Sequence, residues 1–179
     1  AHATYCKTAS ARIALEIGLP IKLELIGRMQ LSYSAAQAMV PKGPGATLKV
    51  GDLGMQIQLA AELPLVLLGI QRLMGGSTDV PEDRHLTEID LVLSERVFQA
   101  LVGPLSACWE EIAAVELTLD RIDAEPNHSA ALAPVSEPTL VISMEARVEQ
   151  HSFTILLLIP YRSIEPISSR LWQAVDMHA

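Results

Sequence analysis

Two hydrophobic periodicities divide the first part of the chain into helices and strands. Residues 4–17 carry Ala, Ile and Leu at helical spacing, and Gly18 and Pro20 end that predicted helix. Residues 21–27 (IKLELIG) alternate apolar and polar positions, which is typical of a half-buried strand. Residues 31–40 then predict a short helix.

A hairpin and an apolar helix follow. Residues 46–60 predict two strands around a Gly-Asp-Leu-Gly turn, because Gly and Asp tolerate the positive φ angles of tight turns. Residues 61–74 predict a helix with Pro64 in its first turn, where a missing N–H costs little. A polar connection, residues 75–86, comes next.

The second half of the chain opens with a strong helix start. Thr87 and Asp90 have the spacing of a capping box, in which each side chain bonds to the other residue's backbone N–H. The predicted helix is long, and its apolar face ends near residue 112. The remaining segments predict a strand at 114–122, a hairpin of two long strands at 139–160 and a closing helix at 161–175.

The two halves have the same order of elements: helix, strand, loop, hairpin, helix. Residues 55–73 align without a gap on residues 153–171. We therefore predict one domain, residues 1–179, built from a duplicated α/β unit with a pseudo-twofold axis. The alternative is a chance likeness of two α/β stretches. The superposed apolar positions are Ile57 and Ile155, Leu59 and Leu157, and Val66 and Ile164.

The repeats are predicted at about residues 4–74 and 87–173, with residues 75–86 as their linker. Each repeat has an amphipathic hairpin that cannot bury its apolar face alone. Pairing the two repeats gives a central, mainly antiparallel sheet with helices on both faces and two long helices among them.

Composition limits the possible partners. The chain has 179 residues and a net charge of −8, from 21 acidic and 13 basic residues. This balance argues against non-specific binding to nucleic acid or to anionic lipid. The densest apolar stretches, 63–70 and 153–160, are shorter than the ~20 residues that a membrane-spanning helix needs, so no membrane insertion is expected. Cys6 and Cys108 are expected to be reduced thiols in a cytoplasmic protein.

The sequence shows no catalytic, metal-binding or cofactor-binding constellation. No His stands beside another His or a Cys at the spacing of metal ligands. Residues 42–46 (KGPGA) resemble a phosphate-binding loop, but they lack the Lys-Ser/Thr that would follow. Adjacent carboxylates such as Glu110 and Glu111 do not converge on one point of a helix. We therefore expect no enzyme activity and no cofactor.

Two consecutive glycines stand directly after the apolar helix. Gly75 and Gly76 have two possible roles. One is a helix C-cap, because Gly commonly ends helices in the left-handed conformation. The other is contact with a partner, because Gly lets another backbone approach closely. The residues alone favour the C-cap role, which suits Gly75; Gly76 is the better candidate for partner contact.

Several short motifs follow one another in a fixed order. Around the glycines they are Gly75-Gly76, Arg84, Leu86-Thr87, Ile89-Asp90 and Trp109, and later in the chain they are Ile-Pro-Tyr and Glu-Pro-Ile between residues 159 and 167. This order resembles the middle domain of the flagellar motor switch protein FliM over about residues 9–172. Each motif alone is weak, but their order and spacing together are specific.

This resemblance implies a three-layer α/β/α, CheC-like fold and a non-catalytic subunit of the cytoplasmic ring of the flagellar motor, on the inner face of the cell membrane. It implies contacts with FliG and with neighbouring FliM copies, and a part in setting the direction of rotation in chemotaxis. FliN and CheY are expected to bind segments outside this chain. The residues that the resemblance places at FliG are Arg72, Gly75, Gly76, Ser77, Thr78, Asp79 and Arg84.

The chain departs from the family pattern at Thr78, where the family has Gly, and this predicts a stiffer loop. One alternative function is that of a CheC-type phosphatase acting on CheY-phosphate, which carries Asp/Ser-x-x-x-Glu-x-x-Asn on each long helix. Here Asp90 is followed by Ser94 and Val97 in place of the Glu and Asn, so we expect no phosphatase activity. A type III secretion ring subunit and an unrelated α/β binding module are further alternatives.

Overall fold

Helices and strands alternate along the part of the chain that the structure, a computed structural model, describes: residues 2–52, 54–128 and 130–170. The helices are α1 (His2–Glu16), α2 (Tyr33–Ala38), α3 (Leu63–Leu73), α4 (Glu88–Ala113) and α5 (Tyr161–Ile164), with short 3-10 turns η1 (Pro126–His128) and η2 (Glu165–Ile167). The strands are β1 (Lys22–Ser32), β2 (Gly45–Val50), β3 (Met55–Ala61), β4 (Leu117–Asp123), β5 (Pro138–Val148) and β6 (His151–Pro160).

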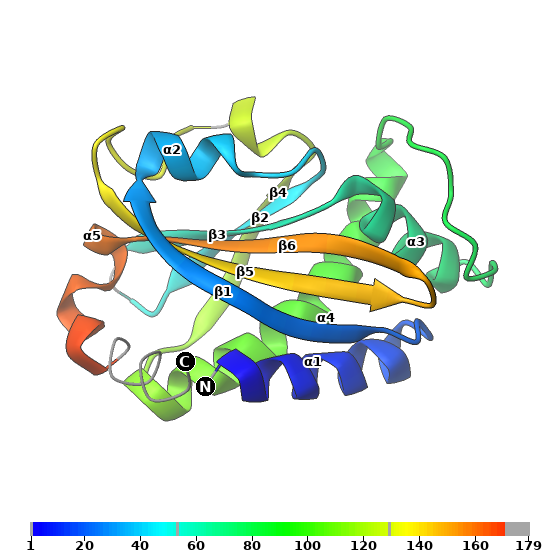
Figure 1. Cartoon of the computed structure of the whole chain (residues 1–179), viewed down its shortest axis with the longest axis horizontal. Helices are drawn as coiled ribbons and strands as arrows, with labels where there is room; N and C mark the ends of the chain where they lie inside the picture. The colour runs from blue at the N-terminus through cyan, green and yellow to red at the C-terminus, as the bar shows by residue number, and fades with distance from the viewer. Residues whose placement is uncertain (1, 53, 129, 171–179) are drawn as a thin grey trace.

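The strands form one antiparallel sheet in the order β1-β5-β6-β3-β2-β4 (Figure 1). When β1, β2 and β3 exchange places with β4, β5 and β6, the result is the same order read from the other edge of the sheet. Leu59 and Leu157, which the alignment of the two halves superposes, lie directly opposite each other across β3 and β6. A twofold axis that relates the two halves therefore passes through this residue pair.

Two serines have equivalent contacts in the two halves. Ser10 Oγ in α1 accepts from the backbone N–H of Leu23, and Ser106 Oγ in α4 accepts from that of Leu117, both at 2.9 Å. Each serine thus ties a long helix to the start of an edge strand. The repeat boundaries of 4–74 and 87–173 remain a prediction, and residues 171–173 lie outside the described part of the chain.

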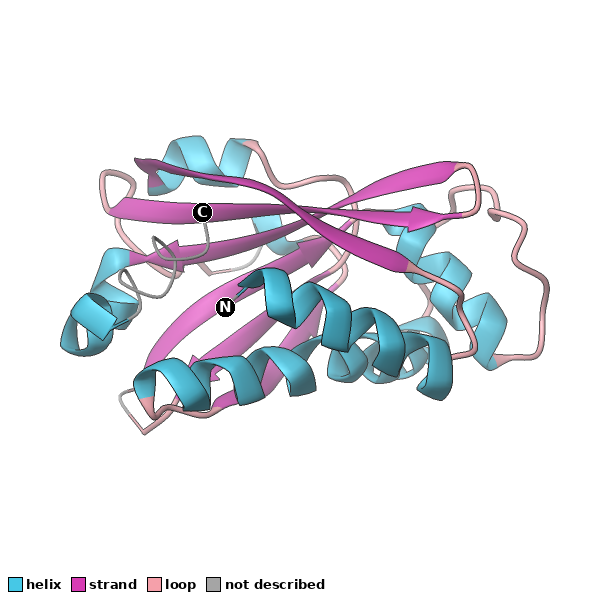
Figure 2. Ribbon diagram, turned by 60° about the horizontal axis from the view of Figure 1, so that its bottom comes forward, coloured by secondary structure: helices cyan, strands magenta, loops and turns pink. Residues whose placement is uncertain are grey.

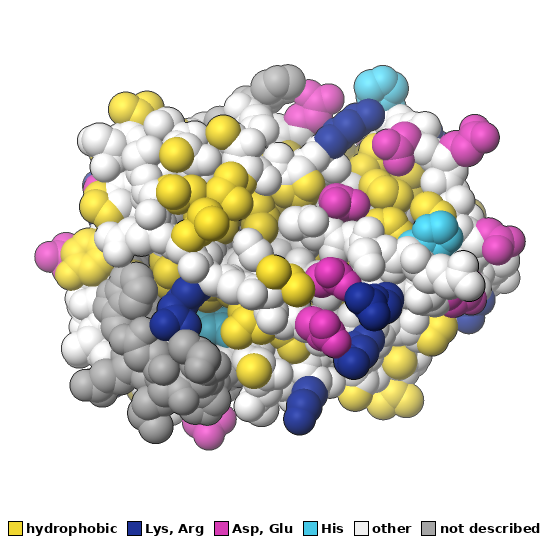
Figure 3. All heavy atoms as spheres, in the orientation of Figure 1, with side chains coloured by type: hydrophobic (Ala, Val, Ile, Leu, Met, Phe, Trp, Pro, Cys, Tyr) yellow, Lys and Arg dark blue, Asp and Glu magenta, His cyan; other side chains and the backbone are white. Residues whose placement is uncertain are grey.

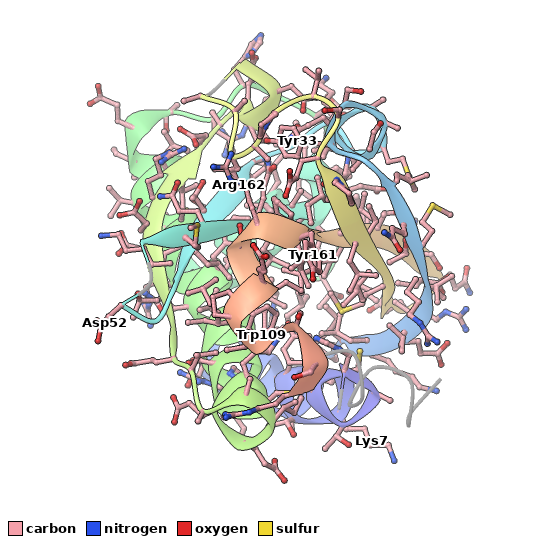
Figure 4. All side chains as sticks on the ribbon, turned by 90° about the vertical axis from the view of Figure 1, so that its left-hand side faces the viewer. Lys7, Tyr33, Asp52, Trp109, Tyr161 and Arg162 are labelled. Atoms are coloured by element: carbon pink, nitrogen blue, oxygen red, sulfur yellow. The ribbon has the colours of Figure 1, made fainter. Side chains whose placement is uncertain are left out.

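Helices cover both faces of the sheet, as the sequence predicts. The larger core lies between the sheet and α1, α3 and α4, and the short α2 covers part of the opposite face (Figures 1 and 2). Trp109, labelled in Figure 4, is fully buried in the larger core, and its Nε1 donates to Nε2 of His2 at 3.3 Å. Burial lowers the pKa of His2 to about 4, so this acceptor nitrogen is unprotonated at neutral pH.

Two elements differ from their predicted limits. The strand predicted at 21–27 continues to Ser32, whose hydroxyl then caps α2 by accepting from the N–H of Ala35. The closing helix predicted at 161–175 is interrupted after Ile164 by a 3-10 turn. Pro166 explains the interruption because it has no N–H to continue the helix. Residues 171–175 of that prediction lie outside the described residues.

The long helix α4 begins with the predicted capping box. The Thr87 hydroxyl accepts from the N–H of Asp90 at 3.2 Å, and the Asp90 carboxylate accepts from the N–H of Thr87 at 2.8 Å. By length and composition, α4 is the one helix of the described residues that could cross a membrane. Half of that apolar window is buried inside the fold, so core packing accounts for its apolar residues.

Candidate docking site

The loop after α3 lies at one end of the sheet, where the connection from α3 to α4 projects from the molecule (Figure 1). We call residues 74–79 the glycine loop. Gly75 has φ +82°, and a Cβ added there would meet nothing within 4 Å. Its N–H donates to the carbonyl of Arg72 at 3.0 Å. Gly75 therefore follows the C-cap residue Met74 and ends the helix in the left-handed conformation, which is the reason for glycine.

Gly76 is required by a close approach within the chain. A Cβ at this position would lie 2.6 Å from Cγ and 2.9 Å from the carbonyl oxygen of Gln71. The N–H of Gly76 donates to that same carbonyl oxygen at 2.8 Å. The sequence assigned this glycine to the approach of a partner. The structure shows that the last turn of α3 already requires it.

Gln71, which the sequence analysis did not single out, holds the glycine loop. Its side-chain Nε2 donates to the carbonyl oxygens of Ser77 and Asp79, both at 2.8 Å. Its own carbonyl accepts from Gly76. The bond from Gly76 belongs to the Schellman motif of a helix that ends in glycine. No local motif predicts the two side-chain bonds, because they depend on how the loop folds back along the helix.

Arg72 ties the loop to a distant turn. Its Nε donates to the carbonyl of Gly18, after α1, at 2.8 Å, and its Nη1 donates to the carbonyl of Gly76 at 2.7 Å. The guanidinium is half-buried, so part of its donor capacity is used inside the chain. Arg72 therefore shapes the loop. Its predicted contact with a partner remains a prediction.

The tip of the glycine loop is polar. Ser77 Oγ accepts from the N–H of Asp79 at 3.2 Å, a local turn that exposes both side chains. Thr78 Oγ1 donates to Oε1 of Glu149 at 2.8 Å, across to the β5–β6 turn. Glu149 itself has φ +54°. The threonine that departs from the family pattern is thus hydrogen-bonded, which supports the expectation of a stiffer loop.

Arg84 belongs to a different arrangement, at the start of α4. Its guanidinium forms a two-pronged ion pair with Asp90, in which Nη2 donates to Oδ1 at 3.0 Å and Nη1 donates to Oδ2. Hydrogen bonds from Arg84, and then from Thr87, hold the pKa of Asp90 well below its usual range, against the effect of burial. The ion pair raises the pKa of Arg84. Arg84 lines a cleft together with Leu63, the first residue of α3, whereas the glycine loop follows the last turn of that helix, so the two lie at opposite ends of α3.

A cleft lies beside Arg84. It has a volume of ≈ 570 Å³ and lies between the linker, the turn at residues 42–43 and residues 124–125. Basic and acidic side chains both line it, including Lys42, Asp83 and His85. Such a mixture selects no charge class of ligand. No cluster of His, Cys, Asp or Glu that could hold a metal ion occurs among the residues that the structure describes.

Apolar side chains are also exposed at the loop end. Met74, between the end of α3 and Gly75, is 72% exposed. Leu15 is 87% exposed near the end of α1, close in sequence to the Gly18 carbonyl that Arg72 contacts. Single exposed apolar residues are normal on a protein surface, so Met74 is a candidate contact only because it adjoins the glycine loop. On the face shown in Figure 3, charges of both signs lie among apolar patches.

Comparison with known proteins identifies the family. A family model described as flagellar motor switch protein FliM matches residues 21–175. The chain belongs to the FliM family. FliM of Treponema pallidum is 23% identical over 172 residues, which are 95% of this chain and 50% of that protein. The chain thus spans about half the length of this curated relative.

Solved structures of FliM show the same fold. The FliM middle domain from H. pylori matches with a TM-score of 0.84 at 16% identity, over 94% of this chain and 92% of that one. A chain of the FliG–FliM complex from H. pylori matches with a TM-score of 0.87 at 17% identity, over 94% of this chain and 93% of that one. At these identities the matches show a shared fold, and they agree with the predicted fold class.

Proposed function

We propose that this chain is the middle domain of a flagellar motor switch subunit, a non-catalytic domain that binds FliG and helps set the direction of rotation. The observation that carries the proposal is the glycine loop. Most of its residues are exposed, and Gly76 and Thr78 are half-buried. Gln71, Arg72 and Glu149 fix its shape by hydrogen bonds. A loop that is ordered before binding loses little entropy when it binds, which favours affinity. The match to the H. pylori FliG–FliM complex supports FliG as the partner.

The remaining partners follow from the family. In this proposal neighbouring FliM copies contact the sides of the domain, and FliN and CheY bind segments outside residues 1–179. The domain then lies in the cytoplasmic ring at the flagellar basal body. Glycine-loop residues Gly75 to Asp79 form the proposed FliG contact, with Met74 added as an exposed apolar neighbour. Arg72 and Arg84 act mainly by holding structure.

The phosphatase alternative is disfavoured by the surroundings of α4. Asp90, Ser94 and Val97 stand where the CheC-type motif would be, and all three are buried. Asp90 is bound to Arg84 and Thr87, and Ser94 Oγ donates to the carbonyl of Leu91 at 2.7 Å. None of these side chains is free to hold a water molecule against a phosphoryl group on a second protein.

A matched pair of surface variants tests FliG binding. Met74 and Val135 are both 72% exposed, but Val135 lies in the loop before β5, away from the glycine loop. Binding of purified FliG from the same organism is measured by calorimetry for the wild type, Met74→Asp and Val135→Asp. We expect Met74→Asp to weaken binding at least about tenfold, as for an apolar interface anchor, and Val135→Asp to change it less than about twofold. A wild type that binds no FliG would refute the proposal. Equal losses of FliG affinity in Met74→Asp and Val135→Asp would show that the glycine loop is not the binding site.

A further inference from the structure

The geometry points to Glu149 as a positioning residue for the glycine loop, through which the second half of the chain fixes the shape of the FliG-binding surface. This inference rests on the proposed function, since it assigns a role within the same site. Glu149 lies at the tip of the β5–β6 hairpin, far from the loop in sequence. Its Oε1 accepts from Thr78 Oγ1 at 2.8 Å.

The contact has a distinct place among the bonds that hold the loop. Gln71 and Arg72 both belong to α3, the helix that the loop follows, and Arg72 adds a bond to Gly18. Within residues 2–52, 54–128 and 130–170, the bond from Thr78 to Glu149 is the one hydrogen bond between the glycine loop and the second half of the chain. This bond is therefore the direct polar link between the β5–β6 hairpin and the glycine loop.

The backbone at Glu149 supports a role for its side chain. Glu149 has φ +54° as the first residue after Val148, a conformation that glycine adopts without strain and glutamate does not. The matching hairpin of the first half has Gly51 after Val50, with φ +53°. The two backbones thus demand the same conformation, and only one half meets the demand with glycine. The strained residue is the one whose carboxylate reaches the loop, and strain of this kind is often retained at functional positions.

Glu149→Gly makes two changes that act on different measurements: relief of the strain raises stability, and loss of the carboxylate loosens the loop. We expect the thermal midpoint of this variant to equal or exceed that of the wild type. We also expect faster hydrogen exchange at the loop amides, Asp79 above all, and FliG binding about three- to tenfold weaker, the value of one hydrogen bond. A purely structural role would lower the thermal midpoint together with binding.

Conservative variants complete the experiment. Glu149→Gln and Thr78→Ser keep the acceptor and the donor, so they should behave as wild type. Thr78→Val should reproduce the effect of Glu149→Gly on the loop, and the double variant Thr78→Val/Glu149→Gly should show no further loss. Loop exchange that is unchanged in Glu149→Gly overturns the inference. Hydrogen exchange is measured on the free chain, so it does not depend on FliG binding. If the wild type binds no FliG but Glu149→Gly still speeds exchange in the loop, the proposed function is refuted and the positioning role of Glu149 is supported.

Discussion

Replacing Gln71 with glutamate tests how the glycine loop is held. Glutamate has the same shape, but it places a carboxylate against the carbonyl oxygens of Ser77 and Asp79, where the amide Nε2 donates at 2.8 Å. Two exposed hydrogen bonds at roughly 0.5–1.5 kcal/mol each give a loss of about 1–3 kcal/mol, and repulsion between the carboxylate and the carbonyls adds to it. Because Gln71 lies at the exposed end of α3, this loss should appear as local opening of the loop, with the core intact.

Hydrogen exchange followed by NMR measures that opening. A loss of about 2 kcal/mol corresponds to roughly thirtyfold faster exchange at the amides of Gly76 and Asp79 if they exchange by local opening. Gln71→Ala is the control, since it removes the same bonds without adding a charge, and it should give a smaller increase. The midpoint of urea unfolding should change little in both variants. Exchange rates in Gln71→Glu equal to those of the wild type would show that the side chain does not hold the loop.

Three further substitutions test the packing and electrostatics around the site. Asp90→Asn should destabilise the chain by roughly 1–3 kcal/mol at pH 7 in urea unfolding. Because the pKa of Asp90 is lowered in the fold, its carboxylate stabilises the fold fully above about pH 4, and this stabilisation is lost progressively as the pH falls below that value. The difference in stability between wild type and Asp90→Asn should therefore shrink at pH 3. A difference that grows in acid would contradict this assignment. Gly69→Ala places a Cβ 2.9 Å from Val97 Cγ2 and should lower the free energy of unfolding by about 1–3 kcal/mol. The double variant Gly69→Ala/Val97→Ala should lose less than the sum of the two single losses, because Val97→Ala removes the clash. A double loss equal to that sum would argue against the clash. Gly75→Ala should cost about 1 kcal/mol through its positive φ alone, and an unchanged thermal midpoint would contradict the C-cap role.

The fold could be predicted from the sequence because its signals are local. Alternation in residues 21–27 and 46–60 identified strands, and the capping box at Thr87 identified the start of the long helix. The ungapped likeness of residues 55–73 and 153–171 identified the duplication that the strand order reflects. Each of these signals lies within a segment that forms one or two elements.

The site could be predicted only in part, since its contacts are not local. The sequence identified the glycine loop, and the resemblance to FliM placed Arg72 and Arg84 at a partner without showing which contacts they make within the chain. Tertiary contacts use both guanidinium groups inside the chain, at Gly18 and at Asp90. Gln71 was missed because its partners are backbone carbonyls, which no residue type reveals.

The duplication gives an internal control for deciding which residues serve the fold. Where the two halves use the same chemistry at matching places, as Ser10 and Ser106 do at the starts of the edge strands, the fold itself explains the residue. Where the backbone is the same and the residue differs, the fold alone does not explain it. Gly51 and Glu149 are such a pair, with φ angles of +53° and +54°. The side chain of Glu149, which Gly51 lacks, lies at the end of the sheet where the glycine loop projects. The glycine loop belongs to the single connection between the two halves, so it has no counterpart under the twofold axis. Asymmetry within a symmetric framework therefore supports the proposal that the glycine loop is the docking surface of this domain.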